Sequence, residues 1–98
     1  MRIVHEAPPV VVLVPSVLTS YSGSAAEIAL QAATVREALA ALERLHPALY
    51  ASVCDETGAV RKHVNLFVNE DHVRELAGLD SLFRPGDELS ILPAVSGG

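Results

Sequence analysis

One segment of this 98-residue sequence has a clear helical period, and it limits what the rest of the chain can build. Between residues 35 and 45, apolar residues recur three and four positions apart, with charged residues largely on the other side. Thr34 and Glu37 have the spacing of a capping box, in which a hydroxyl and a carboxylate satisfy free amide groups, so the helix should begin at Thr34. Pro47 disfavours helical geometry in the residue before it, so the helix should end at His46.

The segment before this helix has the composition and period of a hairpin. Residues 10–18 are dominated by Val and Leu, which predicts a buried strand with Pro15 at a bulge or an end. Small hydroxyl residues and a glycine at 19–24 predict a turn. Residues 25–30 alternate between apolar and other side chains, so we expect them to form the second strand.

The segment after the helix contains two more strands. We expect a short helical turn at 48–53, a surface loop at 55–58, and a strand at 60–69, where apolar residues alternate. A turn is predicted at 84–87 and a last strand at 89–95. The connector before that turn is predicted to supply core contacts through four residues: Leu76, Leu79, Leu82 and Phe83.

The predicted order is therefore two strands, a helix, a strand, an irregular connector and a final strand. A single amphipathic helix needs one face of a sheet to cover, which predicts an α+β fold with the helix lying across a mixed sheet. That layout is the β-grasp, or ubiquitin-like, roll, and we expect it to occupy residues 10–98. Residues 1–9 include Pro8 and Pro9, which suit neither a helix interior nor a ladder, and are predicted to be a flexible leader.

Composition excludes several classes of partner. Half of the residues are apolar and 19% are charged, which is typical of a compact globule. Seven basic residues against twelve acidic ones disfavour direct nucleic-acid binding, which depends on clustered Lys and Arg. The longest apolar run is far shorter than a membrane span, and no secretory signal opens the chain. With only one cysteine, these features predict a cytoplasmic protein.

Strong local motifs for catalysis are absent from the sequence. It contains no P-loop, no G-x-G-x-x-G, no H-E-x-x-H, no zinc-spaced cysteines and no G-x-S-x-G, so we expect no enzyme activity from this chain alone. Cys54 with His46 or His63 would make a nucleophile and a base, but a small, half-buried residue beside a loop is the simpler interpretation.

Two further clusters have simple structural interpretations. The four histidines are scattered over different predicted elements without ligand spacing, so no metal site is expected. Glu70, Asp71 and Glu75 are interpreted as a solvated face, although such a face could also meet a basic patch on a partner.

The C-terminal residues do not fit an ordinary structural role. A strand packed through Leu89 and Ile91 runs into Ser96, Gly97 and Gly98. Residues without side chains can pass down a narrow channel and deliver a terminal carboxylate to another protein. The alternative is a frayed tail or a cloning remnant.

Three stretches together resemble a known family: the strand HVNLFVN at 63–69, GDELSILPAV at 86–95, and the terminal SGG. The chain resembles the ubiquitin-like sulfur carriers of the ThiS and MoaD type, and most of all the MoaD-like carrier of cysteine biosynthesis. The resemblance implies that an E1-like enzyme, using ATP and magnesium, adenylates the carboxylate of Gly98. Sulfur then displaces AMP, leaving a thiocarboxylate that supplies a second, sulfur-accepting enzyme, while Gly97 and Ser96 thread the tail.

Docking of these partners should use the sheet face near the tail. With Val64, Leu66 and Val68 pointing into the core, Phe67 should point outward as an interface anchor, joined by Leu92 and Pro93. The alternative for Phe67 is an edge-packed aromatic covered by the connector.

Other functions remain open at this point. The chain could be the small subunit of a molybdopterin synthase, a ubiquitin-like modifier joined through Gly98 to lysines, or an interaction domain with an inert tail. The sulfur acceptor could belong to cysteine, molybdopterin, thiamine or thiolated-tRNA synthesis.

Overall fold

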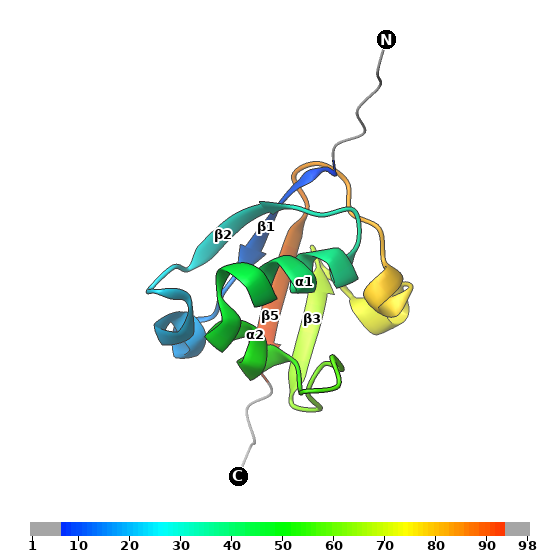
Figure 1. The fold of residues 1–98 in the computed structure, drawn as a ribbon. Coiled ribbons are helices and arrows are strands. Elements are labelled where there is room, and N and C mark those ends of the chain that lie inside the picture. Colours follow the sequence, from blue (N-terminus) through cyan, green and yellow to red (C-terminus); the bar gives the residue numbers. More distant parts are fainter. Residues whose placement is uncertain (1–6, 94–98) are drawn as a thin grey trace.

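A five-stranded mixed sheet forms the centre of the protein (Figure 1). The structure, a computed structural model, describes residues 7–93, so predictions for residues 1–6 and 94–98, including the diglycine end, lie outside the described residues. The strands lie in the order β2-β1-β5-β3-β4. Their bounds are Pro9–Leu13 (β1), Glu27–Gln31 (β2), Val64–Val68 (β3), Asp71–His72 (β4) and Glu88–Pro93 (β5).

The main helix forms where the sequence period predicts it. Helix α1 spans Val35–Leu45 and is followed directly by α2, Pro47–Val53. The Thr34 hydroxyl accepts a hydrogen bond from the Glu37 amide at 3.2 Å, and the Glu37 carboxylate accepts one from the Ala33 amide at 3.1 Å. The cap is therefore reciprocal as predicted, with the carboxylate reaching one residue further back. Three 3-10 helices complete the elements: η1 (Ser16–Ser22), η2 (Val73–Glu75) and η3 (Gly78–Asp80).

The strand directions are those of the predicted β-grasp. Strand β1 pairs with β2 in antiparallel and with β5 in parallel, and β5 pairs with β3 in antiparallel. The helical crossover between the first hairpin and β3 permits the parallel pairing of β1 with β5 in the middle of the sheet. The α+β prediction with one main helix across a mixed sheet is confirmed.

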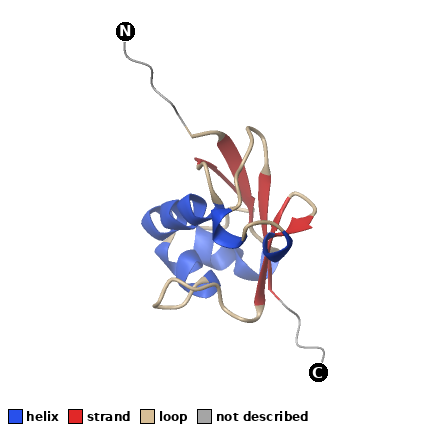
Figure 2. Ribbon diagram, turned by 90° about the vertical axis from the view of Figure 1, so that its right-hand side faces the viewer, coloured by secondary structure: helices blue, strands red, loops and turns tan. Residues whose placement is uncertain are grey.

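The core lies between the helices and one face of this sheet. Figure 2 shows both α helices on the same side of the strands, with the opposite face of the sheet not covered by them. The alternating residues of each strand that point toward the helices are buried. The largest side chains with almost no exposure are Leu42, Leu49, Leu66, Leu89 and Ile91.

The first strand is shorter than predicted and begins one residue earlier, at Pro9, so the prediction that Pro9 belongs to a flexible leader was wrong. It ends at Leu13, and residues 16–22 form a 3-10 helix instead of continuing the strand. Pro15 precedes this helix in an extended conformation, where its lack of an amide hydrogen is harmless. Within the helix the Thr19 hydroxyl donates to the Ser16 carbonyl at 2.9 Å, so local hydroxyl bonding outweighs the strand preference of Val and Leu. The predicted turn glycine, Gly23, does adopt a positive φ of 66°.

Two predictions in the second half of the chain were wrong in detail. Strand β3 begins at Val64 rather than at residue 60, because the Val64 amide donates to the Arg61 carbonyl and closes a turn there. In the connector, Leu76 and Leu82 are 46% and 75% exposed and supply no core contact. Phe83 is buried as expected, and Val73, which was not predicted to contribute, is also buried in the core.

Candidate functional site

Strand β5 carries the chain from the core to its C-terminal residues. It lies between β1 and β3, and its inward residues, Leu89 and Ile91, are 0% and 1% exposed. The last described residue is Pro93, opposite Val64 of β3. Five residues follow it in the sequence, and a fully extended chain of that length spans at most about 18 Å. The neighbouring strands thus fix the position of Pro93, the residue that precedes 94–98 in the sequence.

Pro93 lies beyond the point where β5 stops pairing with β1. The parallel ladder with β1 ends at Leu13 opposite Ser90, and β1 leads away through Pro15. The Asn69 amide donates to the Glu88 carbonyl, so the alternation of the ladder turns the backbone groups of residue 93 away from β3. A proline there removes no ladder hydrogen bond, which is where proline is tolerated in a strand.

A polar clasp holds the opposite end of β5. The Asn69 side-chain carbonyl accepts from the Glu88 amide at 3.0 Å, and its NH2 donates to the Asp87 carboxylate at 3.0 Å. The same carboxylate accepts from the Arg84 amide at 2.8 Å. Gly86 has a φ of 87°, a conformation that favours glycine, so the Gly-Asp pair of the sequence shapes the turn that leads into β5.

Asp87 is expected to stabilise the fold through this clasp. The backbone hydrogen bond from Arg84, followed by the one from the Asn69 side chain, lowers the pKa of the Asp87 carboxyl. We expect Asp87→Ala to lower the free energy of unfolding by about 1–2 kcal/mol in urea denaturation at neutral pH, because hydrogen bonds to charged groups are lost.

The matched control for this prediction is Asp80→Ala. Asp80 forms an exposed ion pair with Arg36 at 3.3 Å, and such pairs contribute little, so a change within about 0.5 kcal/mol is expected. The lowered pKa of Asp87 means that its carboxylate stabilises the fold at a pH above the unfolded-state pKa. This contribution is lost as the pH falls through the folded-state pKa. The two variants should therefore converge in acid, and equal losses at pH 7 would contradict the clasp.

The face of the sheet opposite the helices carries two of the three predicted docking residues, Phe67 and Leu92. Leu92 is 47% exposed and lies opposite Asn65 of β3. Phe67 is half-buried on the same face, and its ring meets the His72 ring edge-on at a centroid distance of 5.0 Å. Phe67 therefore points outward, as predicted, but the ring of His72 in β4 packs against it. Pro93 is half-buried and, by the alternation of β5, shares the face of Ile91 rather than that of Leu92, so the prediction that it joins this face was wrong.

A hydrogen-bonded network orders the polar part of this face. The Arg74 amide donates to His72 Nδ1 at 3.1 Å. His72 Nε2 lies 3.0 Å from the Asn65 side-chain oxygen and 3.2 Å from a guanidinium nitrogen of Arg74. This network was missed from the sequence, because only the pairing of β4 with β3 brings His72 beside Phe67. The sequence did contain one indication, because Asn69 and Glu70 interrupt the strand and predict a tight turn at that point.

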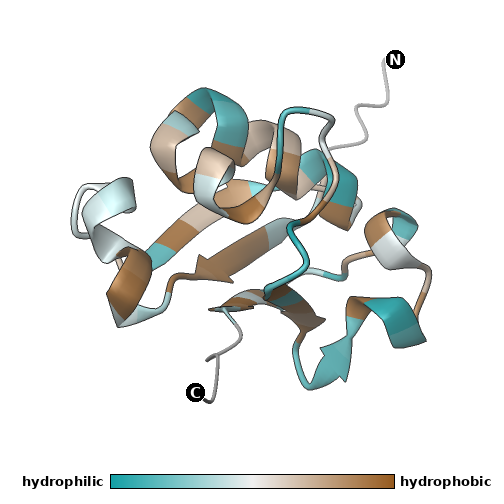
Figure 3. Ribbon diagram, turned by 90° about the horizontal axis from the view of Figure 1, so that it is seen from below, coloured by the Kyte–Doolittle hydropathy of each residue, from teal (hydrophilic) through white to brown (hydrophobic). Residues whose placement is uncertain are grey.

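Hydropathy distinguishes the centre of the sheet from its β4 edge. In Figure 3 the central strands are brown along much of their length, whereas the segment around β4 is teal. Glu70, Asp71 and Glu75, in that segment, are all exposed, which agrees with a solvated acidic face.

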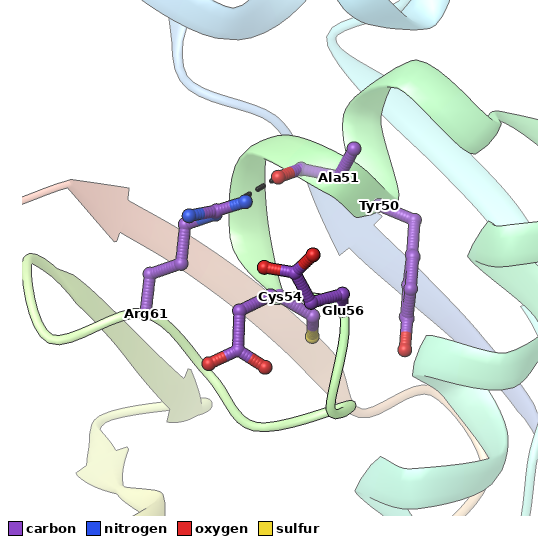
Figure 4. Close-up of a pocket in the computed structure, with 6 residues that line it drawn as sticks. Tyr50, Ala51, Cys54, Glu56 and Arg61 are labelled. Carbon is purple, nitrogen blue, oxygen red and sulfur yellow. Dashed lines mark hydrogen bonds between the residues drawn. The ribbon is translucent and has the colours of Figure 1, made fainter.

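Cys54 lies in a separate pocket at the end of α2 (Figure 4). The pocket has a volume of about 240 Å³, and its lining includes Tyr50 and Arg61 but neither His46 nor His63. The cysteine is 1% exposed, which makes it fully buried rather than half-buried as predicted. Burial raises the pKa of the Cys54 thiol, so the thiolate that a nucleophile needs is disfavoured.

We expect Cys54 to react slowly with iodoacetamide in the folded protein. Access needs local opening, and an opening free energy of about 1.4 kcal/mol already slows the reaction tenfold relative to the unfolded chain. A raised pKa stabilises the fold below the unfolded-state pKa of the thiol, and this contribution is lost as the pH rises through the folded-state pKa. The reaction is measured at neutral pH by mass spectrometry. If Cys54 is alkylated as fast in the folded protein as in urea, the buried placement of the thiol is contradicted.

Two other kinds of feature are absent from the described residues. Among residues 7–93, no three His, Cys, Asp or Glu side chains are grouped so that they could hold a metal ion. Within the same part of the chain, no helix has the length and apolar character needed to cross a membrane.

Comparisons with known proteins agree with the geometry of the sheet and extend to the C-terminal residues. The model of the ThiS family matches residues 12–98. The sulfur carrier protein CysO of Mycobacterium tuberculosis is 30% identical over 91 residues, covering 91% of this chain and 98% of the relative. Small archaeal modifier protein 1 of Haloferax volcanii is 42% identical over 66 residues, covering 67% of this chain and 71% of the relative.

A solved structure shows the same fold. One chain of the crystal structure of the Amycolatopsis orientalis BexX/CysO complex superposes with a TM-score of 0.82 at 34% identity, covering 91% of this chain and 99% of that one. The β-grasp topology, the strand that leads to the diglycine end and the match through residue 98 lead to one conclusion: the chain belongs to the ThiS family of ubiquitin-like sulfur carriers.

Proposed function

We propose that this protein carries sulfur on its C-terminal residue, as a thiocarboxylate of Gly98. The observation that supports this most is the family match, which runs through the diglycine end and not only over the folded body. The rigid position of β5 between two neighbouring strands adds support, because a fixed strand presents the following residues to a partner in a reproducible way.

The proposed chemistry has two steps. An E1-like partner transfers AMP from ATP to the Gly98 carboxylate, forming an acyl-adenylate and releasing pyrophosphate. Sulfide then attacks the acyl carbon and forms a carbon–sulfur bond, AMP leaves with the electrons of the broken carbon–oxygen bond, and loss of the sulfide proton leaves a thiocarboxylate. Activation turns a poor leaving group into a good one, which divides one difficult substitution into two easier ones.

The chain itself is proposed to supply presentation rather than catalysis. ATP and magnesium belong to the E1-like enzyme, and a second enzyme takes up the sulfur. The buried Cys54, with its raised pKa, argues against sulfur being carried on the thiol instead. Because the reaction consumes ATP, we propose that it takes place in the cytoplasm.

The relatives favour one sulfur acceptor over the others. CysO is a sulfur carrier protein, and the similarity spans nearly its full length, so we propose synthesis of cysteine as the destination of the sulfur. Molybdopterin, thiamine and thiolated-tRNA synthesis are the alternatives, and a pull-down of the thiocarboxylated protein would identify the acceptor enzyme.

Intact-mass spectrometry tests the proposed function. The protein is incubated with an E1-like enzyme of this family, ATP and a sulfide donor, and the expected product has one oxygen exchanged for sulfur. Omission of ATP is the control and should leave the mass unchanged. An unchanged mass with an enzyme that thiocarboxylates its own carrier under the same conditions would contradict the proposal.

A second candidate function rests on the likeness to small archaeal modifier protein 1. A modifier would be joined through Gly98 to lysines of other proteins, and its conjugates would be visible as slower bands on a gel of cell extract. If such bands form and no thiocarboxylate is found, the modifier function replaces the carrier function.

We expect Leu92 to contribute to docking of the E1-like partner. Truncation of an exposed apolar side chain at the centre of an interface typically weakens binding by about 1–3 kcal/mol, or roughly tenfold to a hundredfold. Leu92→Ala should show such a loss in calorimetry or surface binding, and Phe67→Ala on the same face should show a loss in the same direction. Pro93 is proposed to assist by directing the tail.

The matched control for docking is Leu82→Ala. Leu82 is more exposed than Leu92, at 75% against 47%, but it lies in the connector and outside β3 and β5. We expect its affinity for the partner to be unchanged. If both leucine variants lose affinity equally, or if Leu92→Ala loses none, the sheet face is not the docking site.

A further inference from the structure

Strand β2 forms an edge of the sheet along its whole length. It pairs with β1 on one side, and in Figure 1 no other described strand lies beyond it. The opposite edge is different, because β4 has only two residues and carries Asp71 in an acidic turn. A short, charged edge resists pairing with another chain, and a five-residue edge with one charged residue at its end resists it less.

The hydrogen-bond phase of β2 identifies which backbone groups face outward. The Val14 amide donates to the Ala26 carbonyl, and the Ala32 amide donates to the Pro8 carbonyl. Because hydrogen-bonded pairs alternate along an antiparallel ladder, the backbone amide and carbonyl groups of the even-numbered residues of β2 face β1. The amide and carbonyl groups of Glu27, Ala29 and Gln31 therefore point to the free edge, where no described backbone or side-chain group bonds to them.

Among the usual protective devices, this edge carries one, the charged side chain of Glu27 at its start. The strand EIALQ contains no proline, lysine or glycine, and its pairing with β1 is regular over five positions without a bulge. The three residues whose backbone faces outward also have exposed side chains. Six hydrogen-bonding groups are thus available in a straight row.

This row is complementary to a second copy of itself. In an antiparallel pair centred on Ala29, each Ala29 exchanges two hydrogen bonds with its counterpart, and each Glu27 lies opposite Gln31 of the second copy. The small alanine leaves room at the two-fold axis. The two Glu27 side chains are four residues apart along the strands, or roughly 14 Å, which is beyond the screening length of about 8 Å at physiological salt.

We propose that two copies of this protein form a dimer by antiparallel pairing of their β2 strands, with the two-fold axis at Ala29. All six outward groups of each copy then find partners, and the two sheets join into one. The contact is small, so we expect a weak dimer with a dissociation constant in the micromolar range or above. A different extended chain at this edge is the alternative that the experiment separates.

The dimer leaves the proposed carrier function accessible. Strand β1 separates the pairing edge from β5, and the docking residues Phe67 and Leu92 lie on β3 and β5. The two-fold axis directs the two β5 strands in opposite directions, so the two tails start from opposite ends of the joined sheet. Thiocarboxylate formation should therefore proceed equally in single and paired copies.

Sedimentation of the full chain over a range of concentrations tests the dimer. Ala29→Glu places two like charges directly opposite each other and should leave a monomer, whereas Ala29→Gln has nearly the same size without the charge and should still dimerise. Ala29→Pro removes an outward amide without breaking a bond to β1 and should also give a monomer. Circular dichroism checks that each variant is folded.

Amide hydrogen exchange supplies an independent measurement on the natural sequence. Exchange at Glu27, Ala29 and Gln31 should slow as the protein concentration rises, while Ile28 and Leu30 should not change. A monomer at every concentration, or a dimer that Ala29→Glu leaves intact, would overturn the proposal. If the natural chain is monomeric but an added peptide protects these amides, the edge binds a different chain and the proposal is likewise wrong.

Discussion

Removal of Gly98 is expected to abolish thiocarboxylate formation completely, while the melting temperature stays unchanged. The deletion removes the Gly98 carboxylate that is proposed to be activated. The new terminal carboxylate, on Gly97, is one residue nearer to the folded body and does not reach the same position in a partner's channel. Every core residue of the described chain lies between Val10 and Ile91, so the deletion removes no known packing. Intact mass after incubation with an E1-like enzyme, ATP and sulfide gives the first result, and thermal denaturation gives the second.

The control for this deletion is a chain that lacks residues 1–6 instead. These six residues are part of the predicted leader, to which no function is assigned, so full thiocarboxylate formation is expected. Sulfur incorporation by the chain that lacks Gly98, at the rate of the full chain, would show that the reactive group is elsewhere. A large loss of melting temperature would show that the terminal glycine supports the fold.

Leu89→Ala is expected to lower the free energy of unfolding by about 3 kcal/mol, since truncating a buried leucine leaves a cavity. Leu89 is fully buried at the centre of the sheet, opposite Val12 of β1 and Val68 of β3. The measurement is urea denaturation at neutral pH. For a domain of this size, the loss corresponds to roughly 10–20 °C in melting temperature.

Leu92→Ala is the control on the same strand. It has the same chemical change three residues away, but Leu92 is 47% exposed and faces away from the helices. We expect it to lower stability by less than about 1 kcal/mol. The two variants thus separate the roles of β5: Leu89 holds the strand in the sheet, and Leu92 is available to a partner. Equal losses would contradict the assignment of the two faces.

The sequence predicted those parts of the fold that local patterns determine. The period between Val35 and Leu45 defines α1, and Thr34 and Pro47 mark its ends because capping and proline geometry act over a few residues. The burial of β3 follows from strict alternation. The extent of the first strand could not be predicted, because the same Val- and Leu-rich composition suits a 3-10 helix once Pro15 interrupts it.

The candidate site shows the same division. The Gly86-Asp87 turn could be predicted from the sequence, since the positive φ of Gly86 is a local requirement, while the role of the diglycine end stays a prediction. The clasp from Asn69 to Asp87 is not, because it joins residues 18 positions apart that meet only when β3 and β5 pair. Exposure of Leu76 and Leu82 was equally hidden, since an apolar residue in an irregular connector has no period that assigns it to a face.

Fragmentation mass spectrometry of the protein purified from its own cells tests the central claim most directly. We expect a fraction of the chains to have one oxygen exchanged for sulfur, with the change located at Gly98 in the C-terminal peptide. A thiocarboxylate and a persulfide differ in mass, because the second adds a sulfur atom without losing oxygen. Sulfur found only on Cys54, or an unmodified Gly98 in cells that are actively making sulfur compounds, would contradict the account.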